Sequence, residues 1–377
     1  MASSITPGQI RRNNRLQVYH YIYNQRRVSQ QDICYGLGLS RPTVTRILPE
    51  LEKKGLIRQS GPITSDQVGR KAGAWSICTD HQVALGVSLT AEEVRIMAVD
   101  LYGQASTPFS INLAYHNADF YYKEVCRHIN EYVSRSGFVS SQVMGIGITL
   151  PGLIAPDGQY VIYGKLLKNT GMPVSVFSDH LSRPCTLIRD MNSAAVIELW
   201  HSPELDSAFY LSLSEHLGAA LISGRAMLTG KHGHSAVIEH LPMVPDGELC
   251  YCGKHGCAET VCSARALLRE GEDPAVFFEK ARQNGSREEQ RLRKYLQDLS
   301  TLICRLHLVY DTDFILGGTL SRHLTNADVA FLHEQVRSMT PISEDPDFIS
   351  VSKAPDTPLA VGAALPYIWS FLGRDDI

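Results

Sequence analysis

Long apolar runs are missing from this chain of 377 residues. Its first residues, MASSITPGQIRRNN, lack the apolar core of a secretory signal peptide, and no later run approaches the roughly 20 apolar residues that a membrane-spanning helix needs. A cysteine pairing pattern is missing as well. Six of the nine cysteines are scattered, as is usual in a reducing cytosol: Cys34, Cys78, Cys126, Cys185, Cys262 and Cys304. We therefore expect a cytoplasmic protein with no membrane partner.

A strong overall charge is also absent, because the net charge is only −3. The charge is nevertheless unevenly divided. Residues 1–79 carry twelve Lys and Arg against four Asp and Glu, a net charge of +8, whereas the remainder carries −11. Such polarity favours a nucleic acid partner for the first segment. The alternative is a solvated basic surface without a partner. At this length we expect two or three domains.

Three short helices are predicted in the basic segment. The first covers residues 10–23. Ser29 is the predicted N-cap of the second, with Asp32 in the acidic position of a capping box, and Gly38 breaks the chain. Ser40 caps a third helix. The buried face of this third helix is marked by apolar residues at helical spacing: Val44, Ile47, Leu48 and Leu51. Two helices joined by a short glycine turn indicate a helix-turn-helix.

In a helix-turn-helix, the second helix of the pair lies in the major groove and presents its N-terminal residues to the bases. The candidate DNA contacts on this helix are Arg41, Thr43, Thr45 and Arg46. Pro49 interrupts the same helix and removes a backbone donor. We therefore expect a kink or an early end near Leu48.

Two predicted strands follow, at residues 56–59 and 74–77, and the loop between them holds Arg70 and Lys71. This arrangement predicts a winged helix whose wing enters a minor groove or contacts phosphates. An alternative is that the glycine-rich loop is disordered.

A cysteine cluster stands out in the second half of the chain. Cys250, Cys252 and Cys257 are spaced Cys-x-Cys-x4-Cys, and Gly253 and Gly256 between them permit tight turns. Three thiolates and one imidazole form a closed tetrahedral zinc site, which is typical of a structural metal. The alternative is a set of ordinary buried thiols. The candidate imidazole ligands are His232, His234, His240 and His255.

From residue 83 onward, β-rich runs alternate with turns and helices. Strands are predicted at 84–89, 93–100 and 143–148, with a helix at 120–136. The pattern recurs after about residue 205, where an expected hairpin joins residues 209–213 and 219–222. This order predicts an α/β body of two lobes with a cleft. The apolar run at residues 359–371 is expected to be a helix packing back onto the first lobe.

These residues carry a resemblance to the ROK family, which contains sugar kinases and winged-helix regulators of the xylose, N-acetylglucosamine and glucose-uptake repressor types. The most specific motif is CYCGKHGCAE at residues 250–259. Supporting motifs are GITLPG at 147–152, DMNSAA at 190–195 and FILGG at 314–318. The resemblance selects His240 as the fourth metal ligand.

The fold implied by the resemblance is an N-terminal winged helix-turn-helix followed by a two-lobed actin-like ATPase fold, usually in homodimers or homotetramers. We expect the DNA-binding domain at residues 1–79 and the first lobe at 80–200, covered by a C-terminal helix within 355–377. The second lobe, with the zinc site, is expected at 201–354.

The segments that hold ATP phosphates in the family's kinases are altered here. Residues 88–92 read SLTAE in place of a glycine-rich Asp-x-Gly-Gly-Thr turn, and residues 214–216 read SEH in place of Gly-Thr-Gly. Glu215 would repel a phosphate. The pair Gly317 and Gly318 persists near the expected adenosine position, but packing alone can require it. We therefore expect no kinase activity.

The sugar pocket is better retained. Asp190, His240 and Glu259 fall on three sugar-binding positions of the family, whereas Arg189 replaces an Asn and Val237 replaces a Glu. We hypothesise that Arg189 favours an anionic effector such as a sugar phosphate or sugar acid. The alternative is that Arg189 pairs with Glu198 or faces solvent.

The sequence thus predicts a transcriptional regulator, a repressor of carbohydrate-metabolism genes. Its partners would be a double-stranded DNA operator and a sugar or sugar-derivative effector in the cleft, and its cofactor a structural zinc. One alternative is a sugar kinase with a DNA-binding extension, which the retention of Asp190 favours. Another is a regulator without an effector, which Val237 favours.

Overall fold

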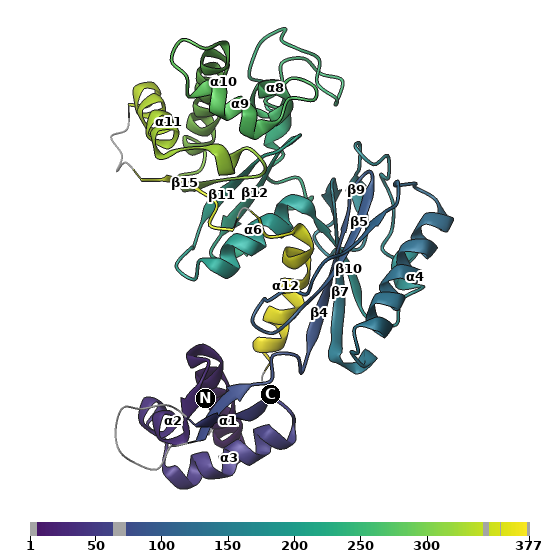
Figure 1. The fold of residues 1–377 in the computed structure, drawn as a ribbon, viewed down its shortest axis with the longest axis vertical. Coiled ribbons are helices and arrows are strands. Elements are labelled where there is room, and N and C mark those ends of the chain that lie inside the picture. The colour runs from purple at the N-terminus through teal and green to yellow at the C-terminus, as the bar shows by residue number, and fades with distance from the viewer. Residues whose placement is uncertain (1–5, 63–72, 342–346, 355, 375–377) are drawn as a thin grey trace.

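The computed structural model describes residues 6–62, 73–341, 347–354 and 356–374 (Figure 1). A small helical domain lies at one end, and two lobes, each built on a five-stranded sheet, lie beyond it. Within the described ranges, no helix is long and apolar enough to cross a membrane.

The N-terminal domain is a three-helix unit with a small antiparallel sheet. Its helices and strands are α1 (Pro7–Gln25), β1 (Val28–Ser29), α2 (Gln30–Leu37), α3 (Arg41–Lys53), β2 (Ile57–Pro62) and β3 (Gly73–Ile77), with strand order β1-β3-β2. The predicted caps are confirmed. Ser29 Oγ accepts from the backbone N–H of Asp32 at 3.1 Å, and the Asp32 carboxylate accepts from Ser29 N at 2.9 Å. Gly38 ends α2 in the left-handed conformation.

A kink or an early end near Leu48 was expected, and the early end is wrong, because α3 continues past Pro49 to Lys53. Leu51, two residues after the proline, is fully buried in the same cluster as Leu48. Burial of a Leu side chain stabilises by roughly 1.5–3 kcal/mol, which offsets much of the roughly 3 kcal/mol that an internal proline costs. The two-residue strand β1 was not predicted, since it is too short to show a periodic pattern.

The first lobe contains a mixed sheet of strand order β10-β7-β4-β5-β6. Strands β4, β5 and β6 form an antiparallel meander, and β7 and β10 add parallel to β4. The bounds of its helices and strands are β4 (Val83–Leu89), β5 (Glu93–Val99), β6 (Phe109–Asn112), α4 (Asp119–Arg135), η1 (Ser140–Gln142), β7 (Val143–Leu150), β8 (Leu153–Ile154), β9 (Val161–Tyr163), α5 (Ser175–Ser178) and β10 (Cys185–Arg189).

The second lobe repeats this topology. Its sheet has the order β13-β12-β11-β14-β15, in which β11, β12 and β13 are antiparallel and β14 and β15 add parallel to β11. The predicted hairpin is therefore confirmed. The bounds are β11 (Ala208–Leu213), β12 (Leu217–Ser223), β13 (Ala226–Met227), η2 (Ile238–His240), α7 (Glu259–Cys262), α8 (Ala264–Leu267), α9 (Pro274–Ala281), α10 (Arg287–His307), β14 (Asp313–Gly317), η3 (Ser321–His323), α11 (Asn326–Met339) and β15 (Ile349–Val351).

Two helices lie between the lobes, α6 (Asp190–His201) and α12 (Leu359–Leu372). Helix α12 packs so closely on the first sheet that a Cβ at Gly86 would lie 1.6 Å from Ala360 O, and one at Gly147 1.9 Å from Ala363 O. These strand glycines are therefore required by packing. Helix α6 packs on the second sheet through Ala195 and Leu199. The duplicated sheets around two central helices confirm the predicted two-lobed fold.

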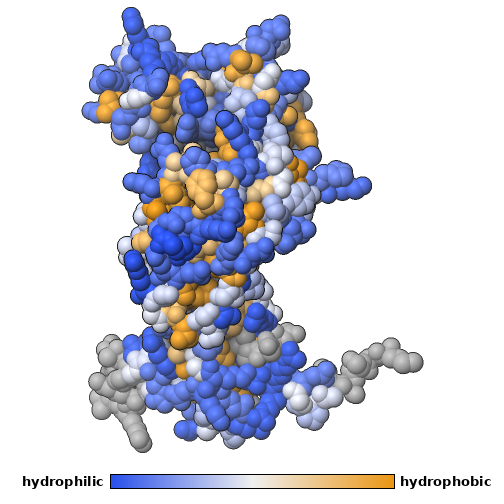
Figure 2. Space-filling model, turned by 90° about the vertical axis from the view of Figure 1, so that its right-hand side faces the viewer, coloured by the Kyte–Doolittle hydropathy of each residue, from blue (hydrophilic) through white to orange (hydrophobic). Residues whose placement is uncertain are grey.

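The winged helix and the first lobe share one hydrophobic cluster, which includes Val18 and Ile22 of α1 and Leu101 of the lobe. At its edge, the turn at residues 100–104 meets the end of α1: Tyr23 Oη donates to Leu101 O at 2.9 Å. The face shown in Figure 2 is largely hydrophilic over the winged-helix end of the molecule.

Candidate functional site

The N-terminal turns of α3 form the candidate DNA interface. Ser40 caps the helix, since its Oγ accepts from Thr43 N at 3.4 Å, and the buried face beyond it turns the remaining side chains outward. Arg41 and Arg46 are exposed, and the structure records no ion pair for either in the part of the chain it describes. Both guanidinium groups are therefore available to phosphates or guanine edges.

The two predicted threonine contacts are less available. Thr43 is half-buried, and its Oγ1 lies 2.8 Å from Ser40 Oγ. Thr45 is exposed, but its hydroxyl donates to Arg41 O at 2.8 Å and accepts from Gln30 Nε2 at 2.5 Å. The Gln30–Thr45 bond joins α2 to α3, and the other two bonds lie within the first turns of α3, so both threonine hydroxyls are engaged by the protein. Arg70 and Lys71 lie outside the described residues.

The four predicted metal ligands converge. The ligand atoms of His240, Cys250, Cys252 and Cys257 all lie within 4.8 Å of one another. Cys252 Sγ is 3.7 Å from Cys257 Sγ, and Cys250 Sγ is 3.7 Å from His240 Nδ1. For Zn–S bonds of about 2.3 Å, tetrahedral geometry places two sulfurs about 3.8 Å apart. The donor set and its spacing therefore fit a zinc ion held by four protein ligands.

The backbone of the metal loop depends on its glycines. Gly253 and Gly256 have φ of 88° and 68°, in the left-handed region. A Cβ at Gly256 would also lie 1.7 Å from Val244 O. Of the rival imidazoles, His255 is turned away, because its Nδ1 lies 2.9 Å from Gly247 O.

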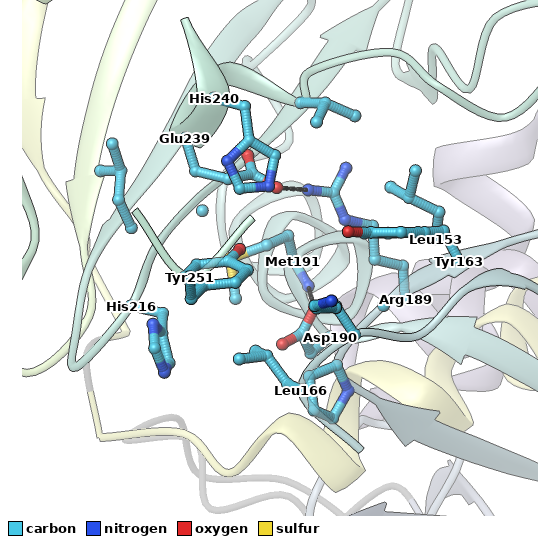
Figure 3. A pocket seen from close by; sticks show the side chains of 16 residues that line it. Leu153, Tyr163, Leu166, Arg189, Asp190, Met191, His216, Glu239, His240 and Tyr251 are labelled. Atoms are coloured by element: carbon cyan, nitrogen blue, oxygen red, sulfur yellow. Dashed lines mark hydrogen bonds and ion pairs between the residues drawn. The ribbon is translucent and has the colours of Figure 1, made fainter. Parts of the chain in front are cut away.

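Beside the metal cluster, the cleft between the lobes narrows to a polar pocket of about 80 Å³ (Figure 3). The hairpin β8–β9 and the start of α6 line one side, and η2 and the metal loop line the other. The polar side chains that line it are Tyr163, Lys165, Arg189, Asp190, His216, Glu239, His240 and Tyr251.

Arg189 ends β10 at the floor of this pocket and is only 7% exposed. Its guanidinium donates to Ser235 O at 3.2 Å and to Ala236 O at 3.4 Å, and lies 3.8 Å from Glu239 Oε1. Pairing with Glu198, the alternative considered from the sequence, does not occur, because the Glu198 carboxylate accepts from the Ser352 hydroxyl. Arg189 thus ties the first lobe to the η2 segment of the second.

Asp190 is the first residue of α6, and its Oδ1 accepts from Met191 N at 2.8 Å. Burial raises the pKa of its carboxyl from 3.8 to about 6, although the positive charge of Arg189 lowers it. Burial likewise raises the pKa of Glu239 across the pocket. Two carboxyl groups of raised pKa that face one cleft from different lobes mark a candidate ligand site.

Glu259 stands behind the pocket wall. Its Oε1 lies 2.7 Å from His216 Nδ1, and its Oε2 accepts from Leu217 N at 2.8 Å. Both oxygens are therefore engaged by the protein, and His216 presents its other edge to the cleft. Tyr251, between two metal ligands, has ring centroids 5.1 Å from both His216 and His240. The metal loop therefore forms part of the pocket wall.

A larger cavity of about 660 Å³ continues from this pocket toward α12. It lies where the resemblance places a kinase's nucleotide. At its wall, Thr319 N donates to Ser214 Oγ at 3.2 Å, so this backbone donor is engaged by the protein. Gly317 is required by packing, because a Cβ there would lie 2.0 Å from Tyr210 Oη. The glycine pair therefore serves the protein's own packing.

Five polar residues that line the pocket were not predicted as ligand contacts: Tyr163, Lys165, His216, Glu239 and Tyr251. Tyr251 lies inside the metal motif, and its central position between Cys250 and Cys252 was the available signal. Glu239 directly precedes His240, but the resemblance directed attention to Val237. Tyr163 sits on a three-residue strand that carries no recognisable pattern.

Comparison with known families matches both parts of the chain. Residues 11–58 match the winged helix-turn-helix DNA-binding family, and residues 85–365, more than half of the chain, match the ROK family. The xylose repressor of Caldicellulosiruptor bescii is 24% identical over 259 residues, which are 68% of this chain and 65% of that repressor. The chain thus spans slightly less than two thirds of that relative's length.

Two solved structures share the fold. A ROK family transcriptional regulator, described as a homologue of the Escherichia coli MLC protein, aligns with a TM-score of 0.68 at 20% identity over 96% of both chains. A ROK family glucokinase from Streptomyces griseus, in complex with glucose and AMPPNP, aligns with a TM-score of 0.62 at 22% identity, over 75% of this chain and 98% of the glucokinase. The second alignment leaves about a quarter of this chain unmatched. With a winged helix-turn-helix preceding its two lobes, this chain belongs to the ROK family.

Proposed function

We propose that this protein is a transcriptional repressor of carbohydrate-metabolism genes that binds a double-stranded DNA operator and responds to a sugar or sugar derivative in its cleft. The observation that carries the proposal is the combination of two sites in one chain. Exposed Arg41 and Arg46 face outward on the recognition helix, and a polar pocket joins the two lobes behind it. Because its partner is DNA, we place the protein in the cytoplasm.

Absence of kinase activity is part of this proposal. Phosphoryl transfer needs donors that hold the phosphates and a metal between them. Here the backbone N–H of Thr319 donates to Ser214 Oγ and is not free for a phosphate. The exposed carboxylate of Glu215 lines the cavity, with its Oε1 3.5 Å from Arg265 Nη1. Asp190 alone can accept a proton but directs no phosphoryl group.

Zinc is proposed as a structural cofactor held by His240, Cys250, Cys252 and Cys257. Four protein ligands leave no open position, so the metal would order the loop that carries Tyr251 into the pocket wall. Metal occupancy and effector binding are then linked through that wall.

Helix α6 connects the effector pocket to the turn that contacts the DNA-binding domain. Asp190 begins it in the pocket, and Trp200 near its other end packs against the turn at residues 100–104, where a Cβ at Gly103 would lie 2.4 Å from Trp200 Nε1. That turn touches α1 of the winged helix. A dimer or tetramer would pair two such winged helices on a two-part operator. An effector that binds one arrangement of the lobes more tightly than another would change the spacing between the two winged helices.

Selection of bound fragments from genomic DNA by the full chain tests the proposal. A specific operator is expected, followed by a change in operator affinity when the correct sugar is added. The rival kinase function predicts ATP consumption in a coupled assay over the same sugars, and a regulator without effector predicts operator binding that no sugar alters. Arg46→Ala is expected to weaken the operator complex without altering sugar binding.

A further inference from the structure

Glu239 has an unusual carboxylate. The residue is 8% exposed and lines the pocket, and its Oε1 lies 3.8 Å from Arg189 Nη2. Its Oε2 is buried and has no hydrogen-bond partner among the residues that the structure describes. Leaving such an acceptor unpaired costs about 1–3 kcal/mol. A buried acceptor at a pocket wall is explained if its partner arrives from outside the chain.

Arg189 is committed to the protein rather than to the pocket. It donates to the carbonyls of Ser235 and Ala236, and Ala236 has a φ of 57°, a left-handed conformation that is strained for a residue with a side chain. The guanidinium thus holds a strained segment just before η2. That segment sets where Glu239 points.

Two carboxyl groups, those of Asp190 and Glu239, line the pocket. Asp190 comes from α6 and Glu239 from η2, so the two carboxyl groups face the ligand space from different lobes. A phosphate or carboxylate placed between them would meet like charges; the buried cation Arg189 is already paired, and Lys165, the other cation that lines the pocket, is exposed. A hydroxyl hydrogen, in contrast, finds an acceptor on each wall.

We propose that Glu239 is an effector-binding residue that accepts a hydroxyl hydrogen bond from an uncharged sugar, and that Arg189 is its positioning residue. This inference rests on the proposed function and names the ligand class of the same cleft. It replaces the hypothesis of an anionic effector at Arg189. It also accounts for Val237, which replaces a sugar-binding Glu of the family: in this chain Glu239, two positions later and next to His240, would supply the carboxylate. A sugar that bonds both Asp190 and Glu239 would bridge the lobes.

Calorimetric titration of the zinc-loaded full chain tests this, with xylose, glucose, N-acetylglucosamine and the 6-phosphates of the two hexoses as probes. The wild type is expected to bind at least one parent sugar, and to bind a hexose at least tenfold more tightly than its phosphate. Glu239→Gln and Glu239→Ala should each weaken binding of the parent sugar at least tenfold, because an acceptor for its hydroxyl is changed or lost. Glu248→Gln, an exposed neighbour outside this pocket, is the matched control and should bind as the wild type does.

Selectivity separates a binding role for Glu239 from a merely structural one. Removing its charge in Glu239→Gln should narrow the affinity ratio between sugar and sugar phosphate, a ratio that general loosening would leave unchanged. Arg189→Gln should weaken the parent sugar, and Arg189→Lys should restore part of that loss. If Arg189 instead binds the anion directly, Arg189→Gln should lose affinity for the sugar phosphate and keep its affinity for the parent sugar. That result would overturn the inference.

The two levels of the proposal fail differently. If no probe binds the wild type or alters its operator affinity, both the proposed function and this inference are overturned. If a sugar binds and acts on the operator but both Glu239 variants bind it unchanged, only the inference falls. Zinc content and operator affinity without sugar show that each variant is folded.

Discussion

Tyr102 is the residue at which the link between the lobes and the DNA-binding domain can be tested most directly. The Arg26 guanidinium carbon lies 3.4 Å from the centroid of its ring, the Tyr23 ring is 5.0 Å away, and Tyr102 Oη donates to Tyr23 O at 3.4 Å. Arg26 itself has a φ of 67°, so its backbone is held in a strained conformation at the end of α1.

Tyr102→Ala removes both ring contacts. A partly exposed cation–π contact contributes about 1 kcal/mol and an aromatic pair about 1 kcal/mol, so docking of the winged helix should weaken by about 2 kcal/mol. That free energy corresponds to roughly a 30-fold change in the equilibrium between docked and undocked domains. Tyr102→Phe keeps the ring and loses only one long hydrogen bond, so it serves as the control.

Hydrogen exchange and operator binding together measure the effect. In Tyr102→Ala, amides at the end of α1 and in the 100–104 turn should exchange faster, by up to about 30-fold if undocking controls their exchange. The ratio of operator affinities with and without sugar should fall toward one, while sugar binding in the cleft persists. If exchange accelerates but the sugar response of Tyr102→Ala equals that of Tyr102→Phe, coupling does not pass through this turn.

Three further changes address the other sites. Cys257→Ser removes one thiolate, so zinc per chain and the melting temperature should both fall; full zinc content would contradict the proposed ligand set. Arg46→Ala should weaken operator binding and, if the contact is to phosphate, reduce the slope of log K against log salt by about 1, whereas Lys123→Ala on α4 should change neither. Asp190→Asn tests the burial of this carboxyl group. In the wild type its folded pKa of about 6 lies above the ordinary value of 3.8, so the free energy of unfolding of the wild type falls as the pH rises from about 4 to 6. The variant should therefore be more stable than the wild type by up to about 3 kcal/mol above pH 6, and this advantage should vanish near pH 4 in thermal unfolding.

Features encoded by neighbouring residues were predictable from the sequence. The capping box of Ser29 and Asp32 depends on residues three apart, and so does the start of α3 at Ser40. The cluster of His240 with three cysteines was predictable for the same reason, since the cysteines lie within eight residues around glycine turns. Only His240 required the family resemblance, because nothing local distinguishes it from three other histidines.

Features that depend on distant contacts were not predictable. The orientation of Glu239 depends on Arg189, fifty residues earlier, gripping the carbonyls before η2. Pro49 could be judged a helix breaker from propensity alone, but burial of Leu51 outweighs that local cost. The partners of Glu259 were not predictable for the same reason: its carboxylate contacts His216 Nδ1 and accepts from Leu217 N, more than forty residues earlier.

Retention of Asp190 was the best support for a kinase, but its position in the fold accounts for it equally well. As the first residue of α6, its carboxylate accepts from Met191 N and lies at the positive end of the helix dipole. A helix of twelve residues is about 18 Å long and moves as one body, so a ligand that displaces Asp190 also displaces Trp200 at the far end. Trp200 cannot move freely, because it is packed against Gly103 and the ring of Trp369. Asp190 thus lies at the pocket end of α6, and Trp200 near the other end packs against the turn that contacts α1 of the winged helix.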